Sequence, residues 1–414
     1  MPAISAHHLY KIFGRRARDG VTRLQQGADP ADLKKAGLTP AVIDASFSVE
    51  EGEIFVVMGL SGSGKSTLIR MINGLLEPTS GHVEVYGENL TAMGPRQLRA
   101  ARREKISMVF QHFALLPHRT VAENAAYGLE IKGVAKDERR RRAIEALEMC
   151  GLEGWQDHKP GELSGGMRQR VGLARALAAD TDVLLMDEAF SALDPLIRRE
   201  MQDQLIELQH KLGKTILFIT HDLNEAMRLG DRIAMMRNGR IVQVGTSEEI
   251  LTDPANDYVA QFVADVDRTR VLTASSVMEK PVAVLGRDQG PRVAHRLMRE
   301  QQQHGLYVTG RDRTLVGYVT EDVVNTHLED SSLSSVMEPV TTVITADTPV
   351  AELFAPAAHN QLPLPVVDDD KRLIGVIPRV TLLAALGAQT ETAIDADLSA
   401  TGPSDDEKEV EGVV

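Results

Sequence analysis

The chain has 414 residues, 43% of them hydrophobic and 25% charged, with a net charge of −13. This length predicts two or three globular domains, and the acidic balance argues against a nucleic-acid binder, which needs a basic face to neutralise phosphates. The one cysteine, Cys150, excludes an internal disulfide framework. We expect it to be a packed apolar side chain rather than a catalytic thiol.

No stretch approaches the roughly 20 apolar residues that a membrane span needs. The first residues, MPAISAHHLYK, lack the apolar core of a secretory signal. We therefore expect a protein that is made and kept in the cytoplasm and that contacts a membrane only through a partner.

Residues 1–266 alternate short apolar runs with helical stretches, a pattern typical of an α/β domain. Continuous apolar runs predict strands buried on both faces of a sheet, at Ile54–Met58, Val183–Met186 and Thr215–Thr220. Helical patterns follow each run, at Lys65–Leu76, Ile197–Leu212 and Leu223–Leu229.

An internal repeat follows this domain. The sequence SSVME occurs at Ser275–Glu279 and, 59 residues later, at Ser334–Glu338. LVGYV at Leu315–Val319 matches LIGVI at Leu373–Ile377, 58 residues later. The nearly equal offsets predict two similar modules in tandem.

The last segment, 387–414, is acidic. Between residues 395 and 414, seven acidic side chains and one lysine give a charge of −6. Such a segment buries too little apolar surface to order itself, so we expect a disordered, solubilising tail.

A glycine-rich loop lies between the first of these strands and its helix. Gly59–Thr67 reads GLSGSGKST and matches the P-loop pattern G-x-x-x-x-G-K-[ST] in its expected context. Its backbone N–H groups and the helix N-terminus would face the phosphates of ATP. Lys65 would reach the β- and γ-phosphates, and the Ser66 hydroxyl would hold Mg²⁺. The candidate ATP-binding residues of this loop are Gly59, Ser61, Gly62, Ser63, Gly64, Lys65, Ser66 and Thr67.

The strand VLLM ends in two carboxylates, Asp187 and Glu188. Strand ends are where ligands bind in open α/β sheets. Asp187 is a candidate Mg²⁺ ligand, and Glu188 is placed to polarise an attacking water as a general base.

The sequence LSGGMRQ at Leu163–Gln169 resembles the signature motif of ABC ATPases. It lies 99 residues beyond Lys65 at Ser164, which leaves space for the helical subdomain of that family, about 112–163. The resemblance implies that Gln111, in VFQHF, is a catalytic residue and Mg²⁺ ligand. It also implies that Asp194, in SALD, contacts nucleotide and that His221, in ITHD, is catalytic.

In that family a second subunit closes the nucleotide site. The resemblance implies that Ser164, Gly165 and Gly166 contact ATP held by the partner's Lys65, so that hydrolysis requires a dimer. Phe13 matches the aromatic residue that stacks on adenine, with Tyr10 as the alternative.

About 26 residues, 15–40, separate LYKIFG from AVIDASFSV. This insertion, together with MGLSGSGKST, VFQHFALLPHRTV, DEAFSALDPLIR and the tandem repeat, resembles the ATPase subunit of glycine betaine/proline-type (quaternary amine) importers. The resemblance implies a motor for compatible solutes such as glycine betaine, proline betaine, choline or proline. It would work with membrane permease subunits, and indirectly with a substrate-binding protein, at the cytoplasmic face of the inner membrane.

Two other functions stay open: an importer ATPase for another small solute, and an ABC ATPase outside transport. The second is disfavoured because no heptad run, as in DNA-repair ATPases, fits between the P-loop and the signature. Translation factors of the class also carry two ATPase domains per chain, whereas this chain has one.

The repeats resemble a CBS-domain pair, about 271–328 and 333–386. CBS pairs that bind adenine nucleotides use a Thr or Ser followed three residues later by Asp. Here Thr320 is followed by Val323, with Asp322 one place early, and the second copy has Pro378 and Thr381. We therefore favour dimerisation or ionic-strength sensing over nucleotide binding.

Three arginines of the first repeat, Arg292, Arg296 and Arg299, have helical spacing and would share one face. Contacts of this face with the acidic tail or with anionic lipid would weaken as salt rises. Our hypothesis is that they hold a transporter off at low salt; the alternative is a solvated face and an inert tail. The predicted architecture is thus a P-loop ABC ATPase domain (RecA-like core plus helical subdomain), a tandem CBS (α+β) module and an acidic tail.

Overall fold

The computed structural model describes residues 1–111, 114–264, 269, 271–330 and 332–385. The chain forms two compact units that divide between Val263 and Ala264. The acidic segment 387–414 lies outside the described residues.

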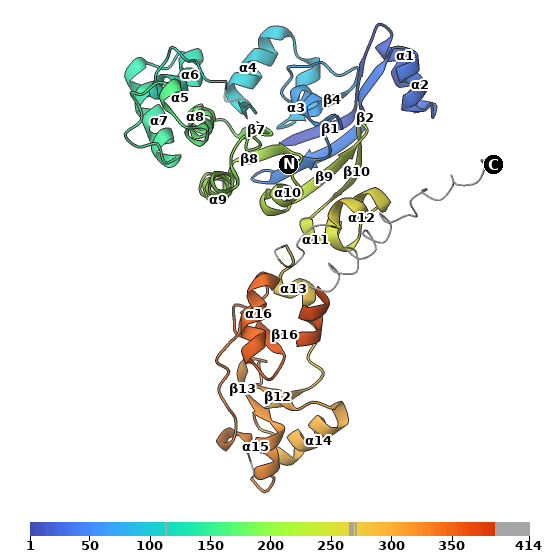
Figure 1. Ribbon diagram of the computed structural model, residues 1–414, viewed down its shortest axis with the longest axis vertical. Helices are drawn as coiled ribbons and strands as arrows, with labels where there is room; N and C mark the ends of the chain where they lie inside the picture. The colour runs from blue at the N-terminus through green and yellow to red at the C-terminus, as the bar shows by residue number, and fades with distance from the viewer. Residues whose placement is uncertain (112–113, 265–268, 270, 331, 386–414) are drawn as a thin grey trace, which may run out of the picture. The chain divides into compact units, whose positions relative to one another are not determined.

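A six-stranded sheet forms the centre of the first unit, in the order β10-β9-β3-β8-β7-β6 (Figure 1). All its neighbouring strands are parallel except the β9–β10 pair. The three predicted strands are present, and the second of them, predicted as Val183–Met186, extends one residue further, to Asp187. The strands are β3 (Ile54–Met58), β6 (Ile106–Val109), β7 (Val183–Asp187), β8 (Thr215–Thr220), β9 (Arg232–Arg237) and β10 (Arg240–Gly245).

A smaller antiparallel sheet has the order β2-β1-β4-β5. Its inner residues, among them Leu9 and Val83, share one hydrophobic core with Phe55 and Leu217 of the large sheet. Helix α3 (Lys65–Ile72) contributes Leu68 to the same core. The strands are β1 (Ile4–Phe13), β2 (Thr39–Val49), β4 (Ser80–Val85) and β5 (Glu88–Asn89).

The helix after the P-loop is shorter than predicted: α3 spans Lys65–Ile72 and does not reach Leu76. Gly74 adopts a left-handed conformation (φ +62°). The N–H groups of Gly74 and Leu75 turn back to the carbonyls of Met71 and Arg70, a Schellman motif that ends the helix. The other helices around the large sheet are α4 (Pro95–Lys105), α9 (Pro195–Leu212), α10 (Leu223–Leu229), α11 (Ser247–Thr252) and α12 (Asp257–Val263).

A separate group of helices lies between β6 and β7 in the sequence (Figure 1). Helices α5 and α8 both contact α7. Cys150, which caps α7, is completely buried, and burial raises the pKa of its thiol to about 12. The expectation of a packed cysteine side chain is confirmed. The helices are α5 (Val121–Ala125), α6 (Tyr127–Ile131), α7 (Lys136–Met149) and α8 (Gly165–Ala178).

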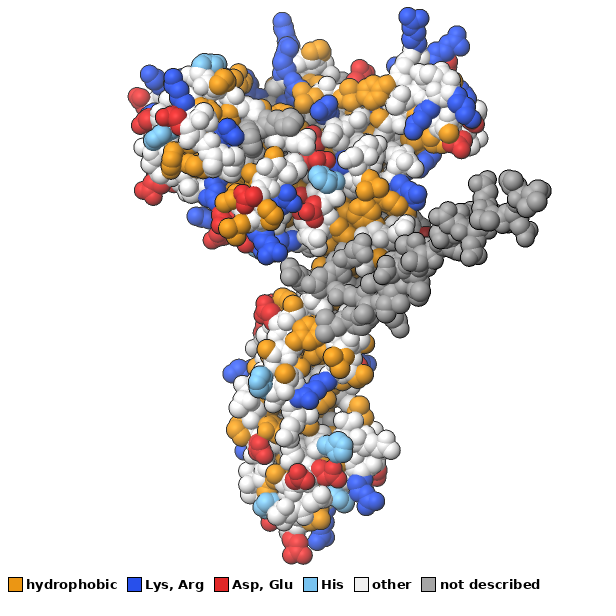
Figure 2. Space-filling model, viewed as in Figure 1, with side chains coloured by type: hydrophobic (Ala, Val, Ile, Leu, Met, Phe, Trp, Pro, Cys, Tyr) orange, Lys and Arg blue, Asp and Glu red, His pale blue; other side chains and the backbone are white. Residues whose placement is uncertain are grey.

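The insertion at 15–40 folds into two short helices, α1 (Ala17–Gln25) and α2 (Pro30–Lys35). Val21, Leu24 and Leu33 pack with residues of β1 and β2 into a small core of their own. Its outer surface carries exposed basic side chains, visible over α1 and α2 in Figure 2: Arg15, Arg16, Arg18, Arg23, Lys34 and Lys35. None of the described helices is long and apolar enough to cross a membrane.

The second unit contains two modules of the same design. Each has a short helix, a strand, a longer helix and a hairpin, and each forms a three-stranded sheet with one parallel and one antiparallel pair. The first module comprises α13 (Ala274–Val277), β11 (Val284–Gly286), α14 (Pro291–Gln301), β12 (Gly305–Thr309), β13 (Leu315–Thr320) and α15 (Glu321–Thr326). The second comprises a 3₁₀ turn (Leu333–Ser335), β14 (Ile344–Thr345), α16 (Val350–His359), β15 (Leu364–Val367) and β16 (Leu373–Ile377).

The repeated SSVME segments are exchanged between the modules. Met278, from the first copy, packs in the core of the second module, and Met337, from the second, packs in the core of the first. Each methionine lies over the glycine of the other repeated motif: a Cβ on Gly317 would be 2.5 Å from Met337, and one on Gly375 would be 2.7 Å from Met278. The two repeats are therefore one folding unit.

This packing predicts the effect of adding a single methyl group. Gly317→Ala should destabilise the second unit by about 1–3 kcal/mol through overpacking, because its Cβ would also meet the backbone oxygen of Glu338 at 2.6 Å. Gly286→Ala is the control, since its nearest neighbour is at 3.9 Å. Scanning calorimetry of the full chain should show a lower transition temperature for Gly317→Ala alone; equal transitions would contradict the exchange.

Candidate functional site

The loop between β3 and α3 is shaped by glycines at two close approaches. Gly64, which caps α3, has φ +108°, and a Cβ there would lie 2.2 Å from the Ala41 carbonyl oxygen. A Cβ on Gly59 would lie 2.2 Å from the Met236 carbonyl oxygen. Any larger residue would push the loop away from β2 and β9.

Lys65 begins α3 and is only 4% exposed. Its Nζ donates to the carbonyls of Gly59 (2.8 Å) and Leu60 (3.2 Å) and lies 3.8 Å from Glu188 Oε1. Burial lowers the pKa of the ammonium, while the charges of Glu188 and Asp187 oppose that shift. The lysine is thus held in place by the loop that it follows.

The neighbouring Ser66 reaches the end of β7. Its hydroxyl donates to Asp187 Oδ1 at 3.1 Å. Burial raises the pKa of Asp187, which is 7% exposed, and the Ser66 hydrogen bond counteracts part of that rise. A hydroxyl and a carboxylate together form an all-oxygen set of the kind that Mg²⁺ prefers.

The Glu188 carboxylate is contacted by several of the predicted site residues. Its Oε2 accepts from Gln111 Nε2 (3.3 Å) and lies 3.1 Å from His221 Nδ1. Glu188 has φ +47°, and its N–H donates to the Ile219 carbonyl at 2.9 Å. The carbonyl of Glu188 accepts a hydrogen bond from the Ser191 hydroxyl. Because β3, β8, β7 and β6 are parallel neighbours, the residues after their carboxyl ends converge at one edge.

The signature residues lie on a separate turn. Ser164 caps α8 and accepts from the Met167 N–H at 3.3 Å, and its residue is exposed. Asp194 likewise caps α9 through the Ile197 N–H at 3.1 Å. Among the described residues, no hydrogen bond or ion pair joins Ser164 to Lys65. One chain therefore brings together the P-loop, Gln111, Asp187, Glu188 and His221, but not the signature.

The two candidate aromatics differ in exposure. Phe13, the last residue of β1, is 44% exposed, with Lys11 Nζ 5.3 Å from its ring centre. Tyr10 is 6% exposed and belongs to the core beneath the insertion. The alternative prediction, that Tyr10 stacks on adenine, is therefore wrong, because the insertion that contains α1 and α2 covers this side chain.

Two residues that support the site were missed in the sequence. Arg175 Nη1 donates to the Ala114 carbonyl at 2.7 Å, and the Asn124 side chain bonds both the N–H and the carbonyl of Leu116. These bonds hold the backbone of Ala114 and Leu116. For Arg175 the sequence offered one signal, a charge inside the apolar stretch VGLARALA of α8. For Asn124 it offered no signal.

The loop fits a polyphosphate. Ser63 Oγ is buried and has no hydrogen-bond partner within the described part of the chain. A Cβ on Gly62, at φ +80°, would meet nothing within 4 Å. An unpaired hydroxyl, open space at a left-handed glycine and the N-terminus of α3 together suit a phosphate. These features define a P-loop nucleotide-binding protein.

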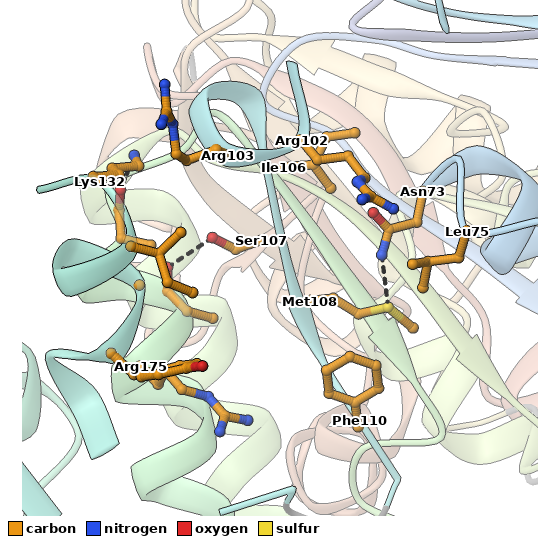
Figure 3. A pocket seen from close by; sticks show the side chains of 15 residues that line it. Asn73, Leu75, Arg102, Arg103, Ile106, Ser107, Met108, Phe110, Lys132 and Arg175 are labelled. Carbon is orange, nitrogen blue, oxygen red and sulfur yellow. Dashed lines mark hydrogen bonds between the residues drawn. The ribbon is translucent and has the colours of Figure 1, made fainter. Parts of the chain in front are cut away.

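Phe110, the residue before Gln111, lines a groove of about 300 Å³ between β6, α4, α6 and α8 (Figure 3). Apolar side chains are exposed along it, with Leu75 at 53%, Phe110 at 38% and Ile131 at 56%. Its other side chains include the basic residues Arg102, Arg103, Lys132 and Arg175.

Comparison with known proteins gives the family. The model of the ABC transporter family matches residues 42–191, and that of the CBS domain matches 274–327 and 333–388. The glycine betaine transport ATP-binding protein OpuAA of Bacillus subtilis (strain 168) is 49% identical, covering 94% of this chain and 93% of that one. The glycine betaine/proline betaine transport system ATP-binding protein ProV of Escherichia coli (strain K12) is 48% identical, covering 92% and 96%.

Among solved structures, the dimeric bacterial ABC transporter cassette MJ0796 is similar with a TM-score of 0.51 and 33% identity, over 59% of this chain and 98% of that one. The chain belongs to the ABC transporter ATP-binding proteins, as part of the group that includes the glycine betaine transport ATP-binding proteins. The predicted ABC ATPase fold with a tandem CBS module is confirmed.

Proposed function

We propose that this chain is the ATP-hydrolysing motor subunit of an importer for glycine betaine and related quaternary amines. The observation that carries the ATPase is the convergence of Lys65, Gln111 and His221 on Glu188, next to the Ser66–Asp187 pair. The solute class is supported by relatives named for glycine betaine, proline betaine and choline transport.

Each residue receives a role from its chemistry. The P-loop backbone, Lys65 and Thr67 would hold the phosphates of ATP, with Phe13 against the base. Ser66 and Asp187, with Gln111, would hold Mg²⁺, which neutralises phosphate charge when bound. Glu188 would accept a proton from the attacking water, and His221, in contact with the same oxygen, would position that carboxylate.

The exposed signature turn implies a second copy of the chain. Ser164 caps α8, and Gly165 and Gly166 begin its first turn, where N–H groups suit an anion. In this proposal they close over ATP held by the partner's Lys65, and the related cassette MJ0796 was solved as a dimer. Closure of the two copies would be the mechanical step.

The groove beside Gln111 is the proposed surface for the membrane permease. Its exposed apolar residues suit the apolar face of a short permease helix, and its basic residues suit a polar or acidic rim. Phe110 lines the groove and precedes Gln111, so a segment bound there would act on the residue that contacts Glu188. The motor would thus work as a peripheral subunit at the cytoplasmic face of the membrane.

The CBS unit is the proposed regulator. Arg292, Arg296 and Arg299 are all exposed on α14, while Ala294 and Met298 are buried. We propose that this face contacts anionic lipid at low salt and is released when the screening length falls from about 8 Å to about 3 Å. The acidic tail, the other contact in the hypothesis, lies outside the described residues.

Glu188→Gln should keep ATP binding but slow hydrolysis about 10²- to 10⁴-fold, because an amide cannot accept the water's proton. The variant should accumulate as an ATP-bound dimer in light scattering. Glu207→Gln, an exposed glutamate on α9, is the control. Hydrolysis by Glu188→Gln near the wild-type rate would remove Glu188 from its role.

Ile131→Asp should lose the permease on co-purification in detergent, because it places a charge in the apolar groove. ATP binding should be unchanged. Val343→Asp, a similarly exposed apolar position in the second unit (51%), is the control. Full retention of the permease by Ile131→Asp would refute the docking surface.

Vesicles containing the whole transporter should accumulate radiolabelled glycine betaine when ATP is inside and the substrate-binding protein is outside. Unlabelled proline betaine should compete. Transport of a different solute, with no uptake of glycine betaine, would leave the motor in place but exclude the proposed solute class.

Arg292/Arg296/Arg299→Gln should shift activation of solute-stimulated ATPase in anionic vesicles to lower internal salt, because the contact to be screened is already weakened. Arg311→Gln, a 94%-exposed arginine of the same module, is the control. Superimposable salt curves for the wild type and the triple variant would refute the proposed contact between this arginine face and anionic lipid.

A further inference from the structure

A cluster of metal-ligating side chains lies on the small antiparallel sheet. His7 of β1 is paired directly with His82 of β4, and their rings are stacked with centres 4.5 Å apart. Glu84 is two residues further along β4, and so on the same face as His82. The His82 Nε2 and Glu84 Oε1 atoms are 3.5 Å apart.

The backbone holds this cluster in place. Val83 and Val85 of β4 point to the opposite face and are completely buried in the core between the sheets. The side chains of His82 and Glu84 therefore face solvent, 42% and 33% exposed. One ligand atom from each of the three residues lies within 4.8 Å of the other two.

We propose that His7, His82 and Glu84 form a binding site for a divalent transition-metal ion of the zinc class. Two imidazole nitrogens and one carboxylate oxygen are a common ligand set for Zn²⁺. Ligands at 2.0–2.1 Å from a tetrahedral ion are about 3.3 Å apart. In the bound state the two imidazole rings would turn out of their stacked arrangement so that one nitrogen of each points at the ion, and water would take the fourth position.

This site differs in chemistry from the nucleotide site. Ser66 and Asp187 offer oxygen only, which suits Mg²⁺, whereas imidazole favours a softer ion. An excess of Mg²⁺ therefore does not compete for it. A bound ion would join β1 to β4 through their side chains, and β1 is the strand that ends at Phe13.

The test uses the full chain without a polyhistidine tag, with Mg²⁺ and a non-hydrolysable ATP analogue present to occupy the nucleotide site. Zn²⁺ alone is titrated against a chromogenic zinc chelator. The wild type should bind one more Zn²⁺ per chain than His7→Ala/His82→Ala. Glu84→Gln should weaken that site by about 10-fold or more, at least as much as loss of an outer-shell partner.

His304→Ala is the matched control, because His304 pairs with a single carboxylate, Glu321, at 3.0 Å. It should bind Zn²⁺ like the wild type. Zn²⁺ should also raise the melting temperature of the wild type and of His304→Ala, but not of the double variant, whose nucleotide binding verifies its fold. Equal stoichiometry and affinity in the wild type and the double variant would overturn the site, as would a wild type that binds no additional Zn²⁺.

Discussion

The first unit depends on one pair of opposite charges, the buried Lys65 ammonium and the partly buried Glu188 carboxylate. A buried ammonium is costly unless hydrogen bonds and an opposite charge replace its water. Here two P-loop carbonyls and Glu188 do so. That arrangement requires β3 and β7, which are the two neighbours of β8, to end at the same edge of the sheet.

The same carboxylate is held in a conformation that the chain rarely adopts. A left-handed glutamate is strained and persists only where its surroundings determine it. The Ile219 carbonyl and the Ser191 hydroxyl fix its backbone, while Gln111 and His221 fix its side chain. A displacement of Gln111, whose neighbour Phe110 lines the groove, would therefore alter the base itself. In the proposed function, a movement of the permease would therefore reach the Glu188 carboxylate through Phe110 and Gln111.

Much of the fold of the first unit could be predicted from the sequence. Strands buried on both faces are continuous apolar runs, so β3 and β8 were predicted with their observed bounds. The end of α3 was missed because the left-handed Gly74 overrides the apolar pattern that continues to Leu76. The burial of Tyr10 depends on the fold of an insertion that its own residues did not reveal.

Features that need three dimensions were out of reach. The SSVME repeat predicted two modules, but not that Met278 and Met337 each pack in the other module. Arg175 and Asn124 act through backbone carbonyls and N–H groups, which no side-chain motif encodes. Likewise, His7 and His82 are 75 residues apart and become neighbours only through the register of β1 with β4.

Since His221 Nδ1 lies 3.1 Å from Glu188 Oε2, we expect these two residues to act as one unit in hydrolysis. A double-mutant cycle tests it directly, with single-turnover ATP hydrolysis measured for the wild type, Glu188→Gln, His221→Ala and the double variant. Residues that act as a unit are strongly non-additive. The double variant should hydrolyse ATP about as slowly as the slower single variant. Losses that multiply would show instead that the two side chains act independently.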